Sequence, residues 1–156
     1  MTLDRVMDHA TQHAPQVNRS LPIALLRARE RVMGPIRQML ADVGVTEQQW
    51  RVLRVLRENG TLDPTEIAER CCLLMPSLTR ILQTLEGKGL LSRERHPTDR
   101  RKQQVTITEG GQQLIEDNLA ESKRLNDWLR TQFGAEKLDA LLDLLNELDA
   151  LEREQA

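Results

Sequence analysis

The sequence predicts a mainly α-helical fold that carries one small β-hairpin. Residues that favour helices, namely Leu, Ala, Glu, Gln and Arg, are abundant among the 156 residues. Apolar residues recur at three- and four-residue intervals over most of the chain, which is the spacing of a helix face. One stretch, residues 90–111, instead reads as two short strands around a Pro-Thr-Asp turn.

The first predicted helix follows a short N-terminal segment without sustained periodicity. We expect residues 1–19 to form a flexible arm. Ser20 is a candidate cap for a helix that continues to about Val43. Gly34-Pro35 lies inside this helix and is expected to bend it, because Pro removes a backbone donor and clashes with the preceding turn.

Two further helices have clear start signals. Thr46 opens one that ends at Asn59 and places Trp50 on or near its buried face. Asp63 opens the next as an N-cap, followed by Pro at the first helical position and Glu at the third. This third helix runs to about Cys71.

A fourth helix and the hairpin follow directly. Pro76 starts a helix that runs through Lys88, and strands are expected at about Leu90–Arg95 and Gln103–Thr108. Helix, turn, helix and hairpin in this order are the arrangement of a winged helix-turn-helix. The hairpin is then the wing.

The C-terminal part of the chain is expected to be helical again. A long helix runs from Glu109 to Phe133, and after a break at Gly134 a last helix runs from Ala135 to the chain end. A wide apolar arc on that last helix either packs onto the first helix or forms a subunit interface. The arc is made by Leu138, Leu141, Leu142, Leu144, Leu145, Leu148 and Leu151.

Charge is distributed unevenly along the chain, although the net charge is only −2. Residues 74–102 carry seven Lys and Arg against three Asp and Glu, whereas residues 103–156 carry five against twelve. Guanidinium groups are rarely buried unless they are paired, so a strongly basic hairpin favours contact with a phosphate backbone over packing. The sequence therefore predicts double-stranded DNA as a partner.

The helix that begins at Pro76 keeps a polar face after its leucines are buried. Arg can bond a guanine edge at two points and Gln an adenine edge, while Ser and Thr bond phosphates or base edges. The alternative is an ordinary solvated polar face, against which the neighbouring basic hairpin argues. The candidate DNA contacts on this helix are Pro76, Ser77, Thr79, Arg80, Gln83 and Thr84.

The wing supplies the remaining candidate DNA contacts. These are Arg93, Arg95, Asp99, Arg100, Arg101 and Lys102. Asp99 is expected to be a brace that caps the turn or pairs with an arginine, because phosphate repels a carboxylate. The other basic residues are expected to meet phosphates or to reach toward the minor groove, and His96 is expected to be a turn residue.

A dimer that binds DNA with two-fold symmetry holds its two recognition helices about one DNA turn apart, ~34 Å. For this reason we favour the subunit interface for the leucine-rich arc, and we expect a homodimer on a pseudo-palindromic operator. The predicted organisation is a flexible arm over 1–19 and a helical dimerisation region made of 20–45 and 109–156. The winged helix-turn-helix DNA-binding domain covers 46–108.

These motifs resemble the MarR family of dimeric winged-helix transcription regulators. Asp99-Arg100-Arg101, followed by apolar residues of the second strand, is similar to the wing signature of that family. Residues 64–68 and 76–90 are similar to its helix-turn-helix. Residues 20–30 and 44–54 resemble the branch that represses operons for degradation of homoprotocatechuate (3,4-dihydroxyphenylacetate). The resemblance implies a repressor that a small phenolic or catecholic acid releases from DNA.

The chain offers groups that suit such an acid. Arg27, Arg29 and Arg31 can form a charge-assisted pair with a carboxylate, and Met33 and Trp50 can supply an apolar wall for a ring. The competing interpretations are plain core packing for Trp50 and surface ion pairing for the arginines.

Other functions have weaker support from the sequence. A regulator of efflux or stress, redox sensing through Cys71 and Cys72, and a winged helix that only binds proteins are the alternatives. Adjacent cysteines rarely close a disulfide, so buried packing is their expected role. No constellation predicts an enzyme, a metal site or a cofactor. No apolar run reaches the about 18 residues of a membrane span, and we expect a cytoplasmic protein.

Overall fold

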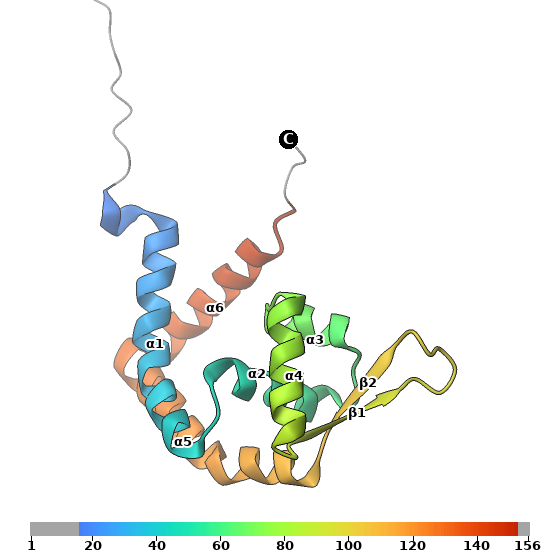
Figure 1. Ribbon diagram of the computed structural model, residues 1–156. Coiled ribbons are helices and arrows are strands. Elements are labelled where there is room, and N and C mark those ends of the chain that lie inside the picture. The colour runs from blue at the N-terminus through green and yellow to red at the C-terminus, as the bar shows by residue number, and fades with distance from the viewer. Residues whose placement is uncertain (1–15, 153–156) are drawn as a thin grey trace, which may run out of the picture. The chain divides into compact units, whose positions relative to one another are not determined.

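The computed structural model describes residues 16–152. The chain divides into two compact units, one up to Met33 and one from Gly34 onward, and the boundary falls inside the first α-helix. Figure 1 shows the elements in chain order. They are η1 (Val17–Arg19, a 3₁₀ helix), α1 (Leu21–Val43), α2 (Glu47–Asn59), α3 (Pro64–Cys71), α4 (Met75–Gly87), β1 (Leu91–Arg95), β2 (Gln103–Ile107), α5 (Glu109–Phe133) and α6 (Ala135–Asp149).

The elements agree with the predicted ones, with small shifts at their ends. Helix α4 begins at Met75, one residue before the expected start, because Pro76 is tolerated anywhere in a first turn. Helix α6 ends at Asp149 instead of continuing toward the chain end. Its last turn is acidic and has no cation, which opposes the helix dipole. Most of the predicted N-terminal arm lies outside the described residues.

Local capping explains where α2 and α3 begin. The Thr46 hydroxyl accepts a hydrogen bond from the Gln49 amide at 3.2 Å, and the Gln49 side chain accepts from the Thr46 amide at 3.1 Å. Asp63 and Glu66 form the same reciprocal pair, with both distances at 2.9 Å. Each capping box satisfies two backbone donors that a helix N-terminus would otherwise leave free.

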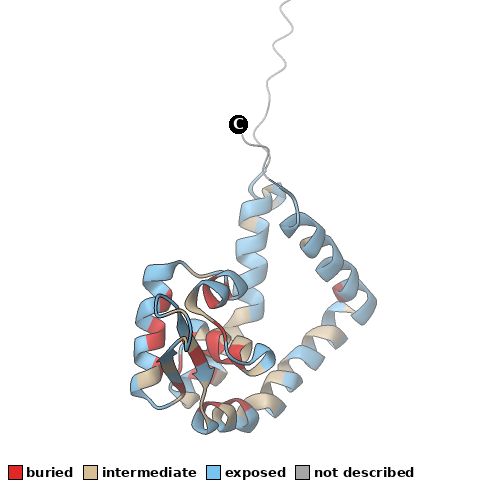
Figure 2. Ribbon diagram, turned by 90° about the vertical axis from the view of Figure 1, so that its right-hand side faces the viewer, coloured by how far each residue is buried: buried red, intermediate tan, exposed pale blue. Residues whose placement is uncertain are grey.

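The core of the second unit lies among α2, α3, α4 and the hairpin, where Figure 2 shows the buried residues gathered. Strands β1 and β2 pair antiparallel with Leu91 opposite Ile107. A bridge from Leu62 to Val105 ties the segment before α3 to β2, through two backbone hydrogen bonds of 3.1 and 2.8 Å. The largest fully buried side chains include Leu53, Leu56, Ile67, Leu78 and Leu85.

A close backbone approach joins the wing to α5. A side chain at Gly111 would collide with the Leu90 carbonyl oxygen and with Ile107, so only glycine fits there. Thr108 caps α5 by accepting from the Gly111 amide at 3.1 Å, and its hydroxyl donates to the Gly89 carbonyl at 2.6 Å. The root of the wing is thereby fixed to the start of α5.

Helix α6 contributes little to that core. Leu138 is its single buried residue, whereas Leu141, Leu142, Leu144 and Leu148 are exposed. Among the described residues, no helix is long and apolar enough to cross a membrane.

Candidate nucleic-acid interface

Helix α4 separates an apolar face from a polar one. Leu78, Ile81, Leu82 and Leu85 are buried. The candidate contacts predicted on this helix are all exposed: Pro76, Ser77, Thr79, Arg80, Gln83 and Thr84. The buried leucines hold the helix on the core, so its other side is open to a partner.

Two hydroxyls on the polar face already have partners inside the helix. Thr79 Oγ1 donates to the Met75 carbonyl at 2.9 Å, and Thr84 Oγ1 donates to the Arg80 carbonyl at 3.0 Å. While these bonds hold, both threonines can accept hydrogen bonds from outside but cannot donate them. Arg80 and Gln83 are therefore the long side chains of this face that can donate to a base edge.

The tip of the wing is held by a compact hydrogen-bond network. The His96 amide donates to the Lys102 carbonyl at 2.9 Å. His96 Nδ1 accepts from the Thr98 and Asp99 amides at 3.3 and 3.2 Å, and Asp99 Oδ1 accepts from the Arg101 amide at 3.1 Å. Asp99 thus caps the turn, as expected of a brace, and His96 is a turn residue.

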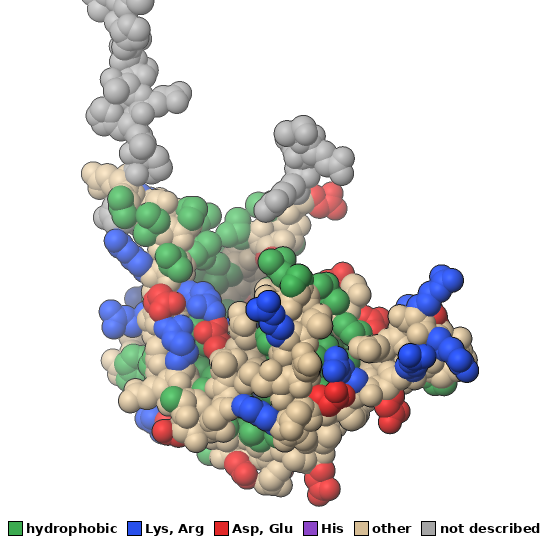
Figure 3. All heavy atoms as spheres, in the orientation of Figure 1, with side chains coloured by type: hydrophobic (Ala, Val, Ile, Leu, Met, Phe, Trp, Pro, Cys, Tyr) green, Lys and Arg blue, Asp and Glu red, His purple; other side chains and the backbone are tan. Residues whose placement is uncertain are grey.

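Four cations project from this ordered tip. Arg95, Arg100, Arg101 and Lys102 are exposed, and none has a side-chain partner among residues 16–152. Figure 3 shows blue Lys and Arg side chains gathered at the end of the wing. Together with Met75 and the start of α3, these four residues line a cleft of about 520 Å³. Unpaired cations along a cleft favour an anionic partner such as a phosphate backbone.

Arg93 differs from the other basic residues of the wing. Its Nη2 and Nε donate to the two carboxylate oxygens of Glu86 on α4, at 2.9 and 3.3 Å. These hydrogen bonds lower the pKa of Glu86, and they raise that of Arg93. The pair fastens the wing to α4, and a phosphate contact by Arg93 stays a prediction.

The residues predicted to bind an acid lie in different compact units. Arg27, Arg29 and Arg31 are exposed on the first part of α1, and Met33 is half-buried there. Arg29 lies 3.6 Å from Glu30, which is the ion pairing that competes with ligand binding. Trp50 is 7% exposed and belongs to the core of the second unit. That these five residues form one ligand site stays a prediction.

Arg54 is not among the acid-binding residues that the sequence predicts. It lies one helical turn after Trp50, so the two side chains emerge on the same face of α2. Its Nη2 donates to Glu58 at 2.9 Å, but its Nε is buried and has no hydrogen-bond partner within the described part of the chain. A buried donor without a partner is costly, and it therefore indicates a place for an acceptor. The i, i+4 spacing of Trp50 and Arg54 was the available signal.

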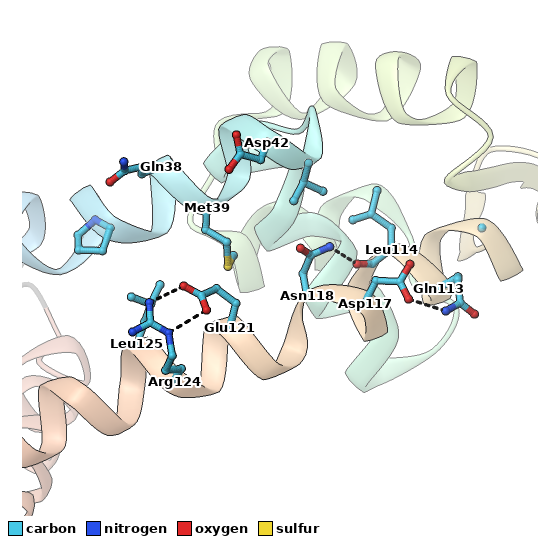
Figure 4. A pocket seen from close by; sticks show the side chains of 13 residues that line it. Gln38, Met39, Asp42, Gln113, Leu114, Asp117, Asn118, Glu121, Arg124 and Leu125 are labelled. Carbon is cyan, nitrogen blue, oxygen red and sulfur yellow. Dashed lines mark hydrogen bonds and ion pairs between the residues drawn. The ribbon is translucent and has the colours of Figure 1, made fainter.

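A groove of about 960 Å³ runs between the end of α1 and the first part of α5 (Figure 4). Its polar residues on α5 are satisfied within that helix. Arg124 donates to both oxygens of Glu121 at 2.8 and 2.6 Å, and Gln113 donates to Asp117 at 2.7 Å. The cation of this groove is neutralised, so the groove does not suit the carboxylate of an acid.

The two cysteines have different environments. Cys71 is buried and its pKa is raised to about 11, mainly by burial, so its thiol is protonated at neutral pH. Cys72 is exposed in a left-handed conformation (φ 52°) that ends α3. The prediction of buried packing is therefore confirmed for Cys71 and wrong for Cys72, because the chain turns outward at the helix end.

Comparisons with known proteins agree with this arrangement. A family model described as MarR family matches residues 45–102. The transcriptional regulator FarR of Neisseria gonorrhoeae is 41% identical, over 85% of this chain and 91% of FarR. The homoprotocatechuate degradative operon repressor of Escherichia coli is 40% identical, over 85% of this chain and 89% of that repressor.

Solved structures show the same fold. A crystal structure of NadR in complex with 4-hydroxyphenylacetate has a TM-score of 0.77 and 39% identity, covering 94% of this chain and 100% of NadR. The predicted winged helix-turn-helix is thereby confirmed. From these matches and the cationic wing beside the exposed face of α4, the chain belongs to the MarR family, whose members are DNA-binding transcriptional regulators that act as dimers and are not enzymes.

Proposed function

We propose that this protein is a cytoplasmic homodimeric repressor of an aromatic-acid catabolic operon, released from a pseudo-palindromic operator by a small phenolic or catecholic acid. The observation that supports the DNA-binding part is the set of four cations on the wing tip, beside the polar face of α4, that have no side-chain partner among the described residues. The cations contact phosphates and set the register, while Arg80 and Gln83 read base edges in the major groove.

We assign DNA binding and dimerisation to the predicted domains. Residues 46–108 contact DNA, and residues 20–45 with 109–156 hold two copies together. The exposed leucines of α6 support this division, because a contiguous apolar surface of that kind marks an interaction site. Two recognition helices held by a two-fold axis then fit half-sites about 10 bp apart.

The effector proposal rests on Arg54 and Trp50 together with the relatives. Arg54 Nε has no hydrogen-bond partner among the described residues, so a carboxylate that enters between the side chains covering this buried atom would satisfy the donor, with the buried indole of Trp50 as an apolar neighbour for the ring. Arg27, Arg29, Arg31 and Met33 stay predicted ligand residues of the first unit. An acid that binds the DNA-free form more tightly lowers operator affinity by the same factor, as thermodynamic linkage requires.

The alternatives have less support from the structure. Redox sensing needs a reactive thiol, and the raised pKa of Cys71 opposes one at that position. A module that binds only proteins does not need four cations on one hairpin tip that lack a partner within residues 16–152. No observation favours efflux or stress as the regulated process.

The DNA-binding proposal is tested by the salt dependence of operator affinity. Arg101→Ala should weaken binding and lower the slope of log affinity against log salt by about 0.9 for each phosphate contact removed, hence by about 1.8 for two copies. Arg124→Ala on α5 is the matched control, since it removes the same charge away from the wing. Equal slopes for the wild type and Arg101→Ala would contradict the assignment.

The effector proposal is tested in a Trp128→Phe background, so that Trp50 is the only indole. Homoprotocatechuate or 4-hydroxyphenylacetate should quench Trp50 fluorescence, raise the Tm and release the operator. Arg54→Ala should abolish release while operator binding persists. Arg57→Ala is the control, because Arg57 lies on the same helix and pairs with Glu116 at 3.5 Å. Release that is unaffected by Arg54→Ala would refute this role.

A further inference from the structure

Two large apolar side chains stand exposed at the start of α4. Leu74 is 77% exposed and Met75 is 43% exposed. Leu74 occupies the N-cap position, where Ser, Thr, Asp and Asn are favoured because their side chains accept a backbone hydrogen bond. The other capped helices of the winged helix-turn-helix follow that rule, with Thr46 before α2 and Asp63 before α3. Leu74 therefore neither packs in the core nor caps its helix.

The surroundings of Met75 are cationic. Met75 lines the same cleft as Arg95, Arg100, Arg101 and Lys102 of the wing. An apolar partner surface alone leaves these four cations without counter-charges. Duplex DNA matches both features, since phosphates meet the cations and the 5-methyl group of thymine provides an apolar group in the major groove.

The adjacent turn of α4 has the same character. Thr79 lies one turn after Met75, on the same side of the helix, and its hydroxyl donates to the Met75 carbonyl at 2.9 Å. Because that hydroxyl proton is used inside the helix, Thr79 offers no donor to a partner while this bond holds. Hydrogen-bond donors appear further along, at Arg80 and Gln83. Apart from the Ser77 hydroxyl, the start of α4 therefore presents apolar side chains.

We propose that Leu74 and Met75 read thymine in the operator through its 5-methyl groups. The inference rests on the proposed DNA-binding function and adds a specificity element to it. Arg80 and Gln83 then recognise bases by hydrogen bonding, while Leu74 and Met75 select thymine over cytosine and over uracil at neighbouring positions.

The test removes single methyl groups from the DNA. An operator is first selected from random duplexes with the wild-type protein, and each thymine is then replaced by deoxyuridine, which lacks only the methyl group. Binding is measured by fluorescence anisotropy. The wild type should bind about fourfold more weakly for each contacted methyl group lost.

Variants assign that loss to side chains. Met75→Ala and Leu74→Ala should bind thymine and deoxyuridine operators equally at the positions that each residue contacts. Arg80→Ala is the matched control in the same helix: it should weaken binding to both duplexes and keep their ratio. Circular dichroism verifies that each variant retains its helices.

Three results would overturn the inference. The wild type could bind every deoxyuridine operator as tightly as the thymine operator, or the preference for thymine could survive in both alanine variants. A lower mass of DNA-free Leu74→Ala than of the wild type in sedimentation would instead show that Leu74 contacts a second copy of the chain. The first two results leave the DNA-binding proposal intact, whereas failure to select any operator would contradict the proposed DNA-binding function.

Discussion

Helices α4 and α6 have similar lengths, 13 and 15 residues, and both repeat leucines at helical spacing, yet the structure treats them differently. In α4 the repeated apolar residues after the first turn, Leu78, Ile81, Leu82 and Leu85, are buried. In α6 only Leu138 is buried, and Leu144 is 61% exposed. Leucines at the same spacing are therefore buried in the core in α4, whereas in α6 they form an apolar face that is open to solvent.

The difference lies in what surrounds each helix. α4 is enclosed by α2, α3 and β1 of its own chain, which supply the buried side chains Leu53, Ile67 and Leu91. Within the described residues of the second unit, α6 packs against α5 and keeps most of its leucines in contact with solvent. Burying such a face releases about 25 cal/mol for each Å² removed from water, so a second copy that covers it is favoured.

The largest expected effect comes from truncating one leucine side chain to alanine in each helix. Leu78→Ala should lower the free energy of unfolding by about 2–5 kcal/mol at any protein concentration, because it leaves a cavity in a closed core. Leu144→Ala should lower the apparent stability only in a concentration-dependent way, since it weakens association. Urea denaturation at two protein concentrations measures both. A concentration-independent loss of equal size for Leu144→Ala would erase the distinction between the helices.

The sequence predicted those features that depend on neighbouring residues. The capping boxes at Thr46 and Asp63, the hairpin and the Asp99 turn all arise within a few residues, so their patterns are visible in the sequence. The pairing of Glu86 with Arg93 could not be predicted in this way, because it joins two elements that only the fold brings together. The same is true of the Arg54 Nε, which lacks a hydrogen-bond partner in the described part of the chain, because burial and not residue spacing produces this feature.

A charge placed on the open face of α6 tests its role directly. Leu144→Glu should dissociate the dimer and weaken operator binding at least about 100-fold, because association would then bury an unpaired carboxylate. Asn146→Glu adds the same charge two residues later on the same helix and should leave the mass and affinity close to those of the wild type. Sedimentation and anisotropy provide the two measurements. A Leu144→Glu protein that remains dimeric would assign the interface elsewhere.

A smaller effect is expected where α4 holds the wing. The pKa of Glu86 lies below its ordinary value of 4.5 because Arg93 donates hydrogen bonds to its carboxylate. The pair therefore stabilises the folded protein fully above pH 4.5, and this contribution is lost as the pH falls through the lowered pKa. Glu86→Gln should show a flatter loss of stability below pH 4.5 than the wild type, and its operator affinity should fall a few-fold.

The control for this prediction is Glu121→Gln on α5. A hydrogen bond from Arg124 also lowers the pKa of Glu121. This variant should therefore show a flatter loss of stability at acid pH as well. It should not change operator affinity, because it lies away from the wing. If the two variants affect operator binding equally, the pair of Glu86 and Arg93 does not position the wing.

Sedimentation velocity of the wild-type chain mixed with a labelled operator duplex at low salt tests the central claim most directly. The cations of the wing and the leucines of α6 must act together, so we predict a complex of two chains on one duplex. A single chain per duplex, or a duplex that sediments free beside monomeric protein, would contradict the account.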